Sequence, residues 1–193
     1  MKYRLTDETK EFYGRILHRI EAIETFGNVE AGEKGGWIEK EENLSQEGLC
    51  WVYGNAQVCC DAHVYGDAWV YGDAQVYDNA WVYGDAQVRG NAQVYGDARV
   101  CGDARVYDNA QVYGDAQIRS HGDIFWIAGL GSRHGTTTIY RNKDGGLTVS
   151  CGCFLGTLEE FEAKVKETHG DNLFGREYRA LIELAKIHFE VNS

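Results

Sequence analysis

A six-residue phrase repeats without interruption from Val52 to Gln117, and it constrains the fold of the middle of the chain. The eleven copies are VYGNAQ, VCCDAH, VYGDAW, VYGDAQ, VYDNAW, VYGDAQ, VRGNAQ, VYGDAR, VCGDAR, VYDNAQ and VYGDAQ. Their first position is always Val, their fifth is always Ala, and their fourth is Asp or Asn. A fixed period of this kind indicates an architecture in which each unit stacks on the next.

The residue types within the phrase predict a short strand followed by a corner. Val favours a strand, and Gly followed by Asp or Asn favours a tight turn. A helix is excluded because a six-residue period drifts around it and the many glycines would destabilise it. We expect Val and Ala to point inward and successive coils to be hydrogen-bonded about 4.8 Å apart. Looser hexads on both sides (KGGWIE, KEENLS, QEGLCW and IRSHGD) extend the predicted β-solenoid to residues 34–123.

This pattern resembles the hexapeptide-repeat family, whose members fold into a left-handed β-helix with three hexads in each triangular coil. The resemblance implies a coil of 18 residues, left-handed winding and assembly into trimers. The chain departs from the family at one position. Tyr usually follows the aliphatic residue here, where the family typically has Gly.

A coil of this length places residues 18 apart in one column along the rod. Gln57, Gln75, Gln93 and Gln111 form such a column, and stacked amides can hydrogen-bond along it. The outward tyrosines form an unbroken column (Tyr77, Tyr95 and Tyr113) and one interrupted by Arg89 (Tyr53, Tyr71 and Tyr107). Exposed aromatic walls indicate a subunit interface, so we expect a homo-oligomer that meets at these tyrosines. The alternative is that Tyr simply covers the strand surface.

Non-repeating segments flank the solenoid and divide the chain into three parts. Residues 1–33 are expected to form an N-terminal cap, a β-hairpin with its turn near Tyr13-Gly14. Residues 124–193 are expected to form a small α+β domain of order βββαα. Its strands are IFWIAGL, TTTIYRN and GLTVSCGCF, and its first helix opens at the capping box from Thr157 to Glu160.

The composition of the chain limits which partners it can bind and in which cellular compartment we expect it. Lys and Arg total 19 against 30 Asp and Glu, giving a net charge of −11, so direct binding to nucleic acid or to an anionic membrane is not expected. The N-terminus lacks the apolar core of a signal peptide, and six cysteines without an export signal indicate free thiols. We therefore expect a cytoplasmic protein.

The chain as a whole is similar to uncharacterised hexapeptide-repeat proteins of phages and prophages. The residues that carry this resemblance are GGWIEKEENLS at 35–45, GSRHGTTT at 131–138 and CGCFLGTLEEFEAKVKETHGD at 151–171. The resemblance implies expression in the cytoplasm of a bacterial host. It implies no particular chemistry.

Acyl transfer is the commonest activity in enzymes that resemble this solenoid, and it generally uses a His as general base. His63 is the one histidine within the eleven hexads, so it is the catalytic candidate. The alternative is a surface histidine in a position that elsewhere holds Gln, Trp or Arg. Because no second catalytic group accompanies His63 in the sequence, the surface histidine is the better interpretation.

The cysteines suggest a metal site only weakly, and we expect neither a metal nor a cofactor. Cys151 and Cys153 flank one Gly, and strand alternation would place both thiols on one face. Cys59 and Cys60 are adjacent and are expected to point to opposite sides. A strong zinc signal needs two spaced pairs.

The segment GLGSRHGTTTIYR is the best local candidate for a ligand site. Its glycines allow backbone N–H groups to converge, and its hydroxyl and cationic side chains suit a phosphate or carboxylate. The candidate ligand-binding residues are Ser132, Arg133, His134, Thr136, Thr137, Thr138 and Arg141. The alternative is a hairpin turn whose threonines line a strand.

These observations favour a non-enzymatic, oligomeric binding or scaffold protein. The resemblance to phage proteins suggests an anti-defence role, in which the protein sequesters an anionic, nucleotide-like small molecule or binds a host protein. Two alternatives stay open: a hexapeptide-repeat acyltransferase, and an acidic DNA mimic whose corner carboxylates imitate phosphates. Turn chemistry already explains the Asp at those corners.

Overall fold

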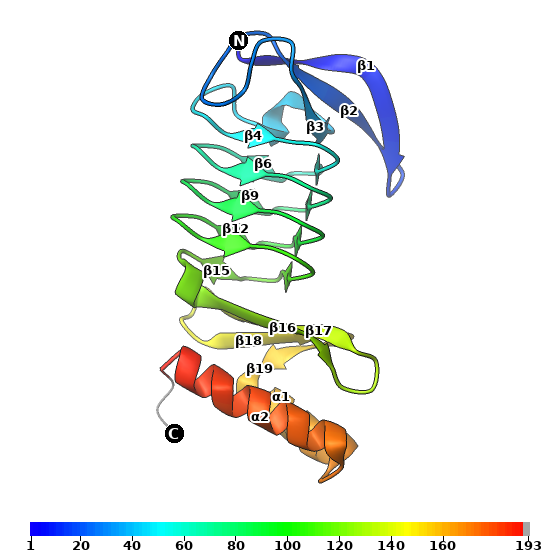
Figure 1. Cartoon of the computed structure of the whole chain (residues 1–193), viewed down its shortest axis with the longest axis vertical. Helices are drawn as coiled ribbons and strands as arrows, with labels where there is room; N and C mark the ends of the chain where they lie inside the picture. The colour runs from blue at the N-terminus through cyan, green and yellow to red at the C-terminus, as the bar shows by residue number, and fades with distance from the viewer. Residues whose placement is uncertain (191–193) are drawn as a thin grey trace.

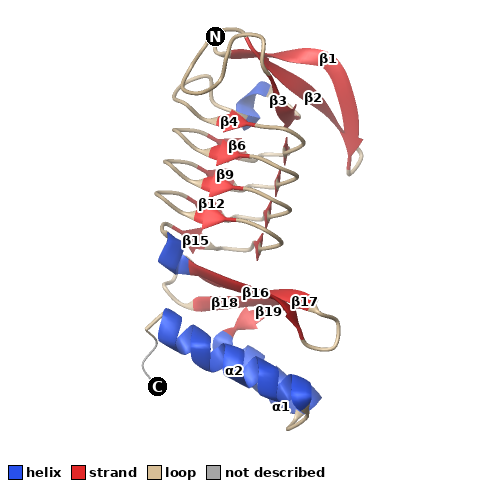
Figure 2. Ribbon diagram, viewed as in Figure 1, coloured by secondary structure: helices blue, strands red, loops and turns tan. Residues whose placement is uncertain are grey.

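The computed structural model describes residues 1–190 and shows a rod of stacked coils with a hairpin at one end and a sheet with two helices at the other (Figure 1). The predicted β-solenoid is confirmed. From β4 to β15 each coil contributes three two-residue strands separated by corners (Figure 2). From β4 onward, neighbouring strands pair in parallel at a spacing of 18 residues, as in Gln57 with Gln75 and Val58 with Val76. The first coil is two residues longer, because Trp37 pairs with Gln57, so the looser hexad KGGWIE does not keep the expected frame.

The strands stack into three sheets, one for each side of the coil, which we call faces 1, 2 and 3. Face 1 contains β3 (Lys34–Ile38), β5 (Gln57–Val58), β8 (Gln75–Val76), β11 (Gln93–Val94) and β14 (Gln111–Val112). Face 2 contains β4 (Trp51–Val52), β7 (Trp69–Val70), β10 (Gln87–Val88) and β13 (Arg105–Val106). Face 3 contains β6 (His63–Val64), β9 (Trp81–Val82), β12 (Arg99–Val100) and β15 (Gln117–Ile118).

The interior of the rod is built from the two invariant positions of the repeat. From Val52 onward the Val and Ala side chains of the eleven hexads are fully or almost fully buried. The corners bring backbones close together: Gly96 has φ +69°, and a Cβ placed on it would lie 2.9 Å from the backbone nitrogen of Gly114. Gly is therefore required there for its left-handed conformation and for the close approach of the next coil.

The N-terminal segment forms a hairpin of β1 (Tyr3–Phe12) and β2 (Arg15–Ala22), joined by a turn at Tyr13 and Gly14. β2 pairs with β3, so the hairpin continues face 1 and projects from the side of the rod (Figure 1). Its first residues cover the open end of the solenoid. The Lys2 ammonium donates to the carbonyl oxygen of Cys50 at 2.9 Å, and the Tyr3 hydroxyl donates to that of Leu44 at 2.7 Å.

The C-terminal unit has four strands rather than the three expected. The sheet contains β16 (Ile124–Leu130), β17 (Gly135–Arg141), β18 (Leu147–Cys151) and β19 (Phe154–Thr157), in that order. The segment 146–154, expected to be one strand, turns back at Gly152, which has φ +59°. The helices are α1 (Leu158–His169) and α2 (Leu173–His188), and short 3-10 turns lie at Glu41–Asn43 and His121–Asp123.

The capping box at the start of α1 is confirmed. Glu160 N donates to Thr157 Oγ1 at 3.2 Å, and Thr157 N donates to Glu160 Oε2 at 2.8 Å. The sheet lies between the last coil and the two helices (Figure 1). Tyr140 packs into the solenoid core, whereas Ile139 packs into a second core with the helices. In residues 1–190, neither helix has the length and apolar run needed to span a bilayer.

Candidate functional site

The sequence-predicted loop forms an exposed turn between β16 and β17. Ser132, Arg133 and His134 are all exposed there. His134 has a left-handed backbone with φ +49°, and its Nδ1 lies 3.4 Å from the carbonyl oxygen of Gly129. These three residues share one turn, as the sequence predicts.

The threonines that follow are used mainly for packing. Thr137 and Thr138 are each 1% exposed. Thr137 Oγ1 donates to Cys151 Sγ at 3.2 Å on the helix side of the sheet, and Thr138 Oγ1 accepts from Gln111 N at 3.2 Å on the solenoid side. Thr136 is half-buried on the same strand. The alternative interpretation, threonines lining a strand, describes Thr137 and Thr138.

Arg141 lies at the far end of β17 from the exposed turn. Its Nε is 3.3 Å from Asp123 Oδ1, and its guanidinium donates to the carbonyl oxygen of Phe189 at 3.1 Å. A seven-residue strand separates it from His134 by roughly 20 Å, because extended chain rises about 3.3 Å per residue. The expectation that the turn and Arg141 act on one ligand is therefore wrong.

The two tyrosine columns are spaced as predicted, and in the unbroken column the rings stack along the rod. The Tyr77 and Tyr95 ring centroids are 4.8 Å apart with an interplanar angle of 4°, and those of Tyr95 and Tyr113 are 4.6 Å apart. Tyr13 of the hairpin turn lies 6.4 Å from Tyr77. All six predicted interface tyrosines are half-buried in the single chain rather than fully exposed. Their role in an oligomer stays a prediction.

Tyr53 and Tyr71 of the interrupted column line a groove on the side of the rod. The groove has a volume of about 580 Å³, within the usual range for small-molecule sites. The strands of face 2 and the corner that follows them supply most of its walls, and we call it the groove on face 2. The lining residues are Asn28, Tyr53, Trp69, Tyr71, Gly72 and Gln87.

The aromatic rings of this groove are held at fixed angles by their neighbours. Tyr53 and Trp69 have ring centroids 5.6 Å apart and planes tilted by 54°. The Tyr71 hydroxyl donates to Gln87 Oε1 at 3.3 Å, which holds the Gln87 amide group at the wall of the groove. Tyr107, the last member of the column, carries the guanidinium of Arg89 over its ring at 4.8 Å.

The charge on face 2 and on the corner that follows it is balanced. Asp73, Asp108 and Arg89 lie on that corner, and Arg105 lies on the face itself. Within the eleven hexads, the corner after face 1 carries four acids: Asp61, Asp78, Asp97 and Asp115. Face 2 is thus more receptive to an anion than the net charge of −11 suggests.

His63 lies in a second, smaller groove on face 3, with a volume of about 270 Å³. Its Nδ1 is 2.8 Å from the carbonyl oxygen of Glu42, and its ring meets Trp81 edge-on at 5.7 Å. A carbonyl acceptor at Nδ1 favours the tautomer in which Nε2 is the free base. Trp81 and Tyr65 line the same groove.

The cysteines lie differently from the sequence expectation. The Cys59 and Cys60 Sγ atoms are 3.6 Å apart rather than on opposite sides, because the left-handed backbone of Cys60, φ +62°, ends the strand alternation. Cys151 ends β18 and packs beside Thr137, whereas Cys153 is exposed in the next turn. Cys151 and Cys153 therefore do not share one face of a strand, as alternation along a single strand would require.

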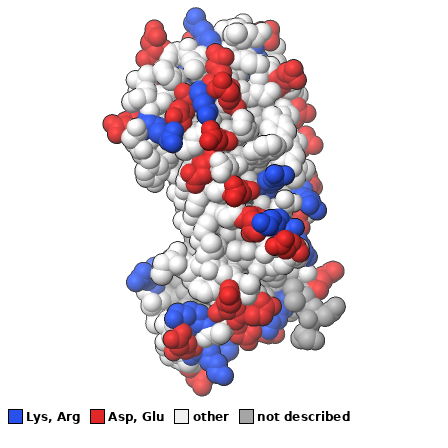
Figure 3. All heavy atoms as spheres, turned by 180° about the vertical axis from the view of Figure 1, so that it is seen from behind, with Lys and Arg blue, Asp and Glu red and all other residues white. Residues whose placement is uncertain are grey.

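The corner acids bind neighbouring coils. Asp67 Oδ1 accepts from Leu49 N at 3.0 Å, and Asn79 donates to Asp97 Oδ1 at 3.0 Å. The charged side chains also cluster over the two ends of the rod and along one edge, and the recessed side of its middle is largely uncharged (Figure 3). Asp67 and Asp97 therefore have a structural role between coils, in addition to the turn preference expected from the sequence.

The groove on face 2 was missed by reasoning from the sequence, although part of its signal was present. Trp69 occupies the sixth position of a hexad, where most copies have Gln or Arg. Such a substitution in a regular repeat marks a specialised coil. Asn28 gave no signal, because only the path of the chain after the hairpin brings it to Tyr53 and Trp69.

Comparison with known proteins supports the solenoid. Residues 74–90, 92–107 and 98–114 match the family described as YdcK beta solenoid repeat. The chain is also similar to the protein named uncharacterized acetyltransferase YdcK of Escherichia coli strain K12, with 43% identity over 60 residues. That match covers 27% of this chain and 18% of the relative. Both matches support a hexapeptide-repeat β-helix.

Proposed function

We propose that the chain is a non-enzymatic binding protein whose face 2 groove holds a small molecule with a planar ring and an anionic group. The observation that carries this proposal is the aromatic groove of Tyr53, Trp69 and Tyr71, with the Gln87 amide at its edge. Flat aromatic walls bind a planar ring by stacking, and an amide can hydrogen-bond to the edge of that ring.

The arginine next to the groove would bind the anionic group of the ligand. Arg89 follows Tyr71 in the same column, one coil further along the rod. A guanidinium in that position can bind a phosphate in bidentate fashion while the ring stays in the groove. A nucleotide combines both features. Sequestering a nucleotide signal of a host defence fits the resemblance to phage proteins, and a host protein is the alternative partner.

Calorimetric titration and thermal-shift measurement with a panel of mono-, di- and cyclic nucleotides test this function. We expect one or more nucleotides to raise the melting temperature, and Trp69→Gln to abolish that shift. Gln is the residue that the repeat itself most often uses at this position, so the variant should fold. Trp81→Gln is the matched control, since it makes the same change on face 3.

Three results would contradict this assignment in different ways. If no nucleotide binds the wild-type chain, the proposed ligand class is wrong. If Trp69→Gln binds as tightly as the wild type, the groove is not the site. If Arg133→Ala alone removes binding, the exposed turn between β16 and β17 is the site after all.

Acyl transfer is a second candidate, favoured by the orientation of His63. The contact of its Nδ1 with Glu42 O and the groove beside Trp81 suit a general base. The relative named an acetyltransferase adds to this candidate. Turnover of acetyl-CoA that is lost in His63→Gln would establish acyl transfer. The variant should fold, because Gln is the commonest residue at this position of the repeat. Equal turnover in the variant would exclude His63.

Assembly into a homo-oligomer, with a trimer implied by the family resemblance, belongs to the same proposal. The stacked tyrosines that follow the strands of face 1 (Tyr77, Tyr95 and Tyr113) would be the contact surface. Sedimentation velocity gives the mass in solution directly. A monomer across the accessible concentration range would leave the tyrosines with the alternative role of covering the strands.

A further inference from the structure

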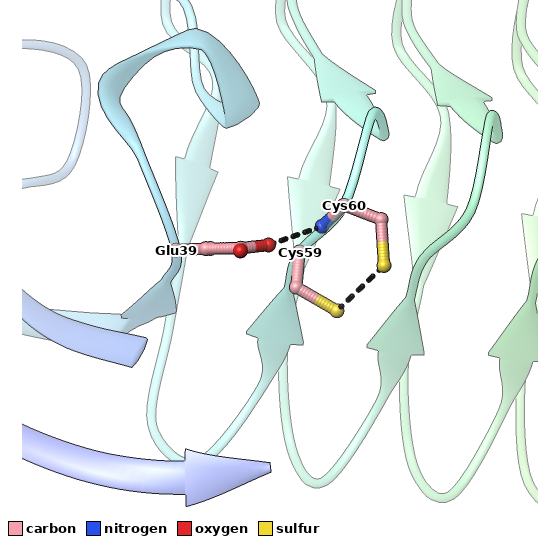
Figure 4. Close-up of side chains that lie close together, drawn as sticks. All are labelled: Glu39, Cys59 and Cys60. Carbon is pink, nitrogen blue, oxygen red and sulfur yellow. Dashed lines mark hydrogen bonds between the residues drawn. The ribbon is translucent and has the colours of Figure 1, made fainter. Parts of the chain in front are cut away.

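Three residues with potential metal ligands lie close together at one corner of the solenoid: the Glu39 carboxylate meets the Cys60 nitrogen, and the Cys59 and Cys60 sulfurs meet each other (Figure 4). One atom each from Glu39, Cys59 and Cys60 lies within 4.8 Å of the other two. Glu39 directly follows β3, and the cysteines directly follow β5, so the cluster joins two neighbouring strands of face 1.

The separation of the two thiols fits a tetrahedral metal. Zinc binds thiolate sulfur at about 2.3 Å, so two thiolates on one tetrahedral zinc ion are about 3.8 Å apart. The Cys59 and Cys60 Sγ atoms are already 3.6 Å apart. Only small movements of the side chains are needed to place both sulfurs on one ion.

The backbone at Cys60 is unusual for its residue type. Cys60 occupies the third position of its hexad, which is Gly in most copies, and it keeps the left-handed conformation with φ +62°. Asp78 and Asp108 replace Gly at this position in two other hexads, and Asp tolerates that conformation better than Cys does. Strain of this kind often marks a functional position.

Glu39 is held in place by two partners. Arg15 of the hairpin donates to Glu39 Oε1 at 2.8 Å, and the backbone N–H of Cys60 donates to Glu39 Oε2 at 2.7 Å. The carboxylate is therefore preorganised beside the thiols. An open groove of about 330 Å³, lined by Tyr13, Arg15, Cys59, Cys60, Tyr77 and Asp78, lets solvent and ions reach the cluster.

We propose that Cys59, Cys60 and Glu39 form a binding site for a soft divalent cation of the zinc type. On binding, each thiol releases its proton to solvent and its sulfur bonds to the metal, while a carboxylate oxygen of Glu39 supplies the third ligand. Water from the groove supplies the fourth. The charges balance, because two thiolates, one carboxylate, the Arg15 guanidinium and the dication sum to zero.

Cobalt(II) titration of the full chain, kept reduced by a phosphine, tests this site. We expect one equivalent of cobalt to bind with the intense visible bands of a tetrahedral thiolate complex, and zinc to displace it. Cys60→Gly and Cys59→Tyr should each remove those bands. Both variants restore the consensus of the repeat, so they should fold, and circular dichroism checks that they do.

Cys101→Tyr is the matched control. Cys101 occupies the same position of its hexad as Cys59 but is followed by Gly, so the variant should bind cobalt like the wild type. The proposal is overturned if the wild-type chain binds no cobalt, or if a folded Cys60→Gly variant keeps the tetrahedral bands. Loss of the bands in Cys151→Ser, with Cys60→Gly unaffected, would place the metal in the C-terminal domain and also overturn it.

Discussion

The backbone N–H of Gln111 donates a hydrogen bond to the hydroxyl oxygen of Thr138, with 3.2 Å between nitrogen and oxygen. Gln111 is in the last strand of face 1. The residue 18 positions before it, Gln93, donates its N–H to the carbonyl oxygen of Ala110 on the following coil. No such coil follows Gln111, so a threonine of the C-terminal sheet takes the place of the missing carbonyl. This bond joins the solenoid to the C-terminal sheet.

Thr138→Val should destabilise the chain by about 1–3 kcal/mol, because it leaves the Gln111 N–H without its acceptor while keeping the shape of the side chain. Urea denaturation measures the change in the free energy of unfolding. Thr136→Val, two residues earlier on the same strand, is the control and should change that free energy little. Equal effects of the two variants would show that the Thr138 hydroxyl does not cap the solenoid.

Gly96→Ala should destabilise the chain more than Gly114→Ala. The two glycines occupy equivalent corners with φ of +69° and +66°, so both variants incur the cost of a left-handed Ala, about 1–2 kcal/mol. The Ala at 96 would also meet the next coil at 2.9 Å, whereas nothing lies within 4 Å of a Cβ at 114. Thermal denaturation ranks the two variants, and the reverse order would contradict the close stacking of the corners.

Lys2→Met should lower the free energy of unfolding by about 2 kcal/mol, because a buried backbone carbonyl loses a charged donor. Lys2 is 2% exposed, and its ammonium is 2.9 Å from the carbonyl oxygen of Cys50. The same change at the exposed Lys164 should have little effect. If the Lys2 variant is as stable as the wild type, the N-terminal residues do not secure the first coil.

The stability of the chain should fall as pH rises from about 10 to about 12. Burial, followed by the neighbouring Tyr113, raises the pKa of Tyr95 to about 12, whereas an unfolded tyrosine has a pKa near 10. In this interval the unfolded chain loses the proton first, so the stabilisation that is complete below pH 10 is progressively lost.

Denaturation at a series of alkaline pH values measures that slope. Tyr95→Phe removes the ionisable group but keeps the ring between Tyr77 and Tyr113, so its stability should fall less steeply with pH than that of the wild type. An unchanged slope in the variant would show that Tyr95 ionises equally easily in the folded and unfolded chain.

Much of the solenoid was predictable because its information is local and repeated. Each hexad fixes which side chains point inward, because it has Val at the first position, Ala at the fifth and a corner at the third and fourth. The period then fixes which residues stack. Counting in eighteens therefore predicted the glutamine and tyrosine columns, including the contacts of Tyr95 with Tyr77 and Tyr113.

The candidate sites depended on contacts between segments far apart in the sequence, and there the sequence was insufficient. It grouped Arg141 with the exposed turn, although strand geometry places them at opposite ends of β17. It separated Cys59 from Cys60, because alternation along a strand takes no account of a left-handed corner residue.

The sequence by itself thus determined the stacked coil, its inward residues and its columns, because the same local conformational preference recurs in all eleven hexads. Only the tertiary structure decided that Lys2 caps the first coil and Thr138 the last. It also decided that Asn28 and Arg15 lie against coils distant in sequence. The physical reason is that such contacts depend on the path of the non-repeating segments across the rod. No local periodicity encodes that path.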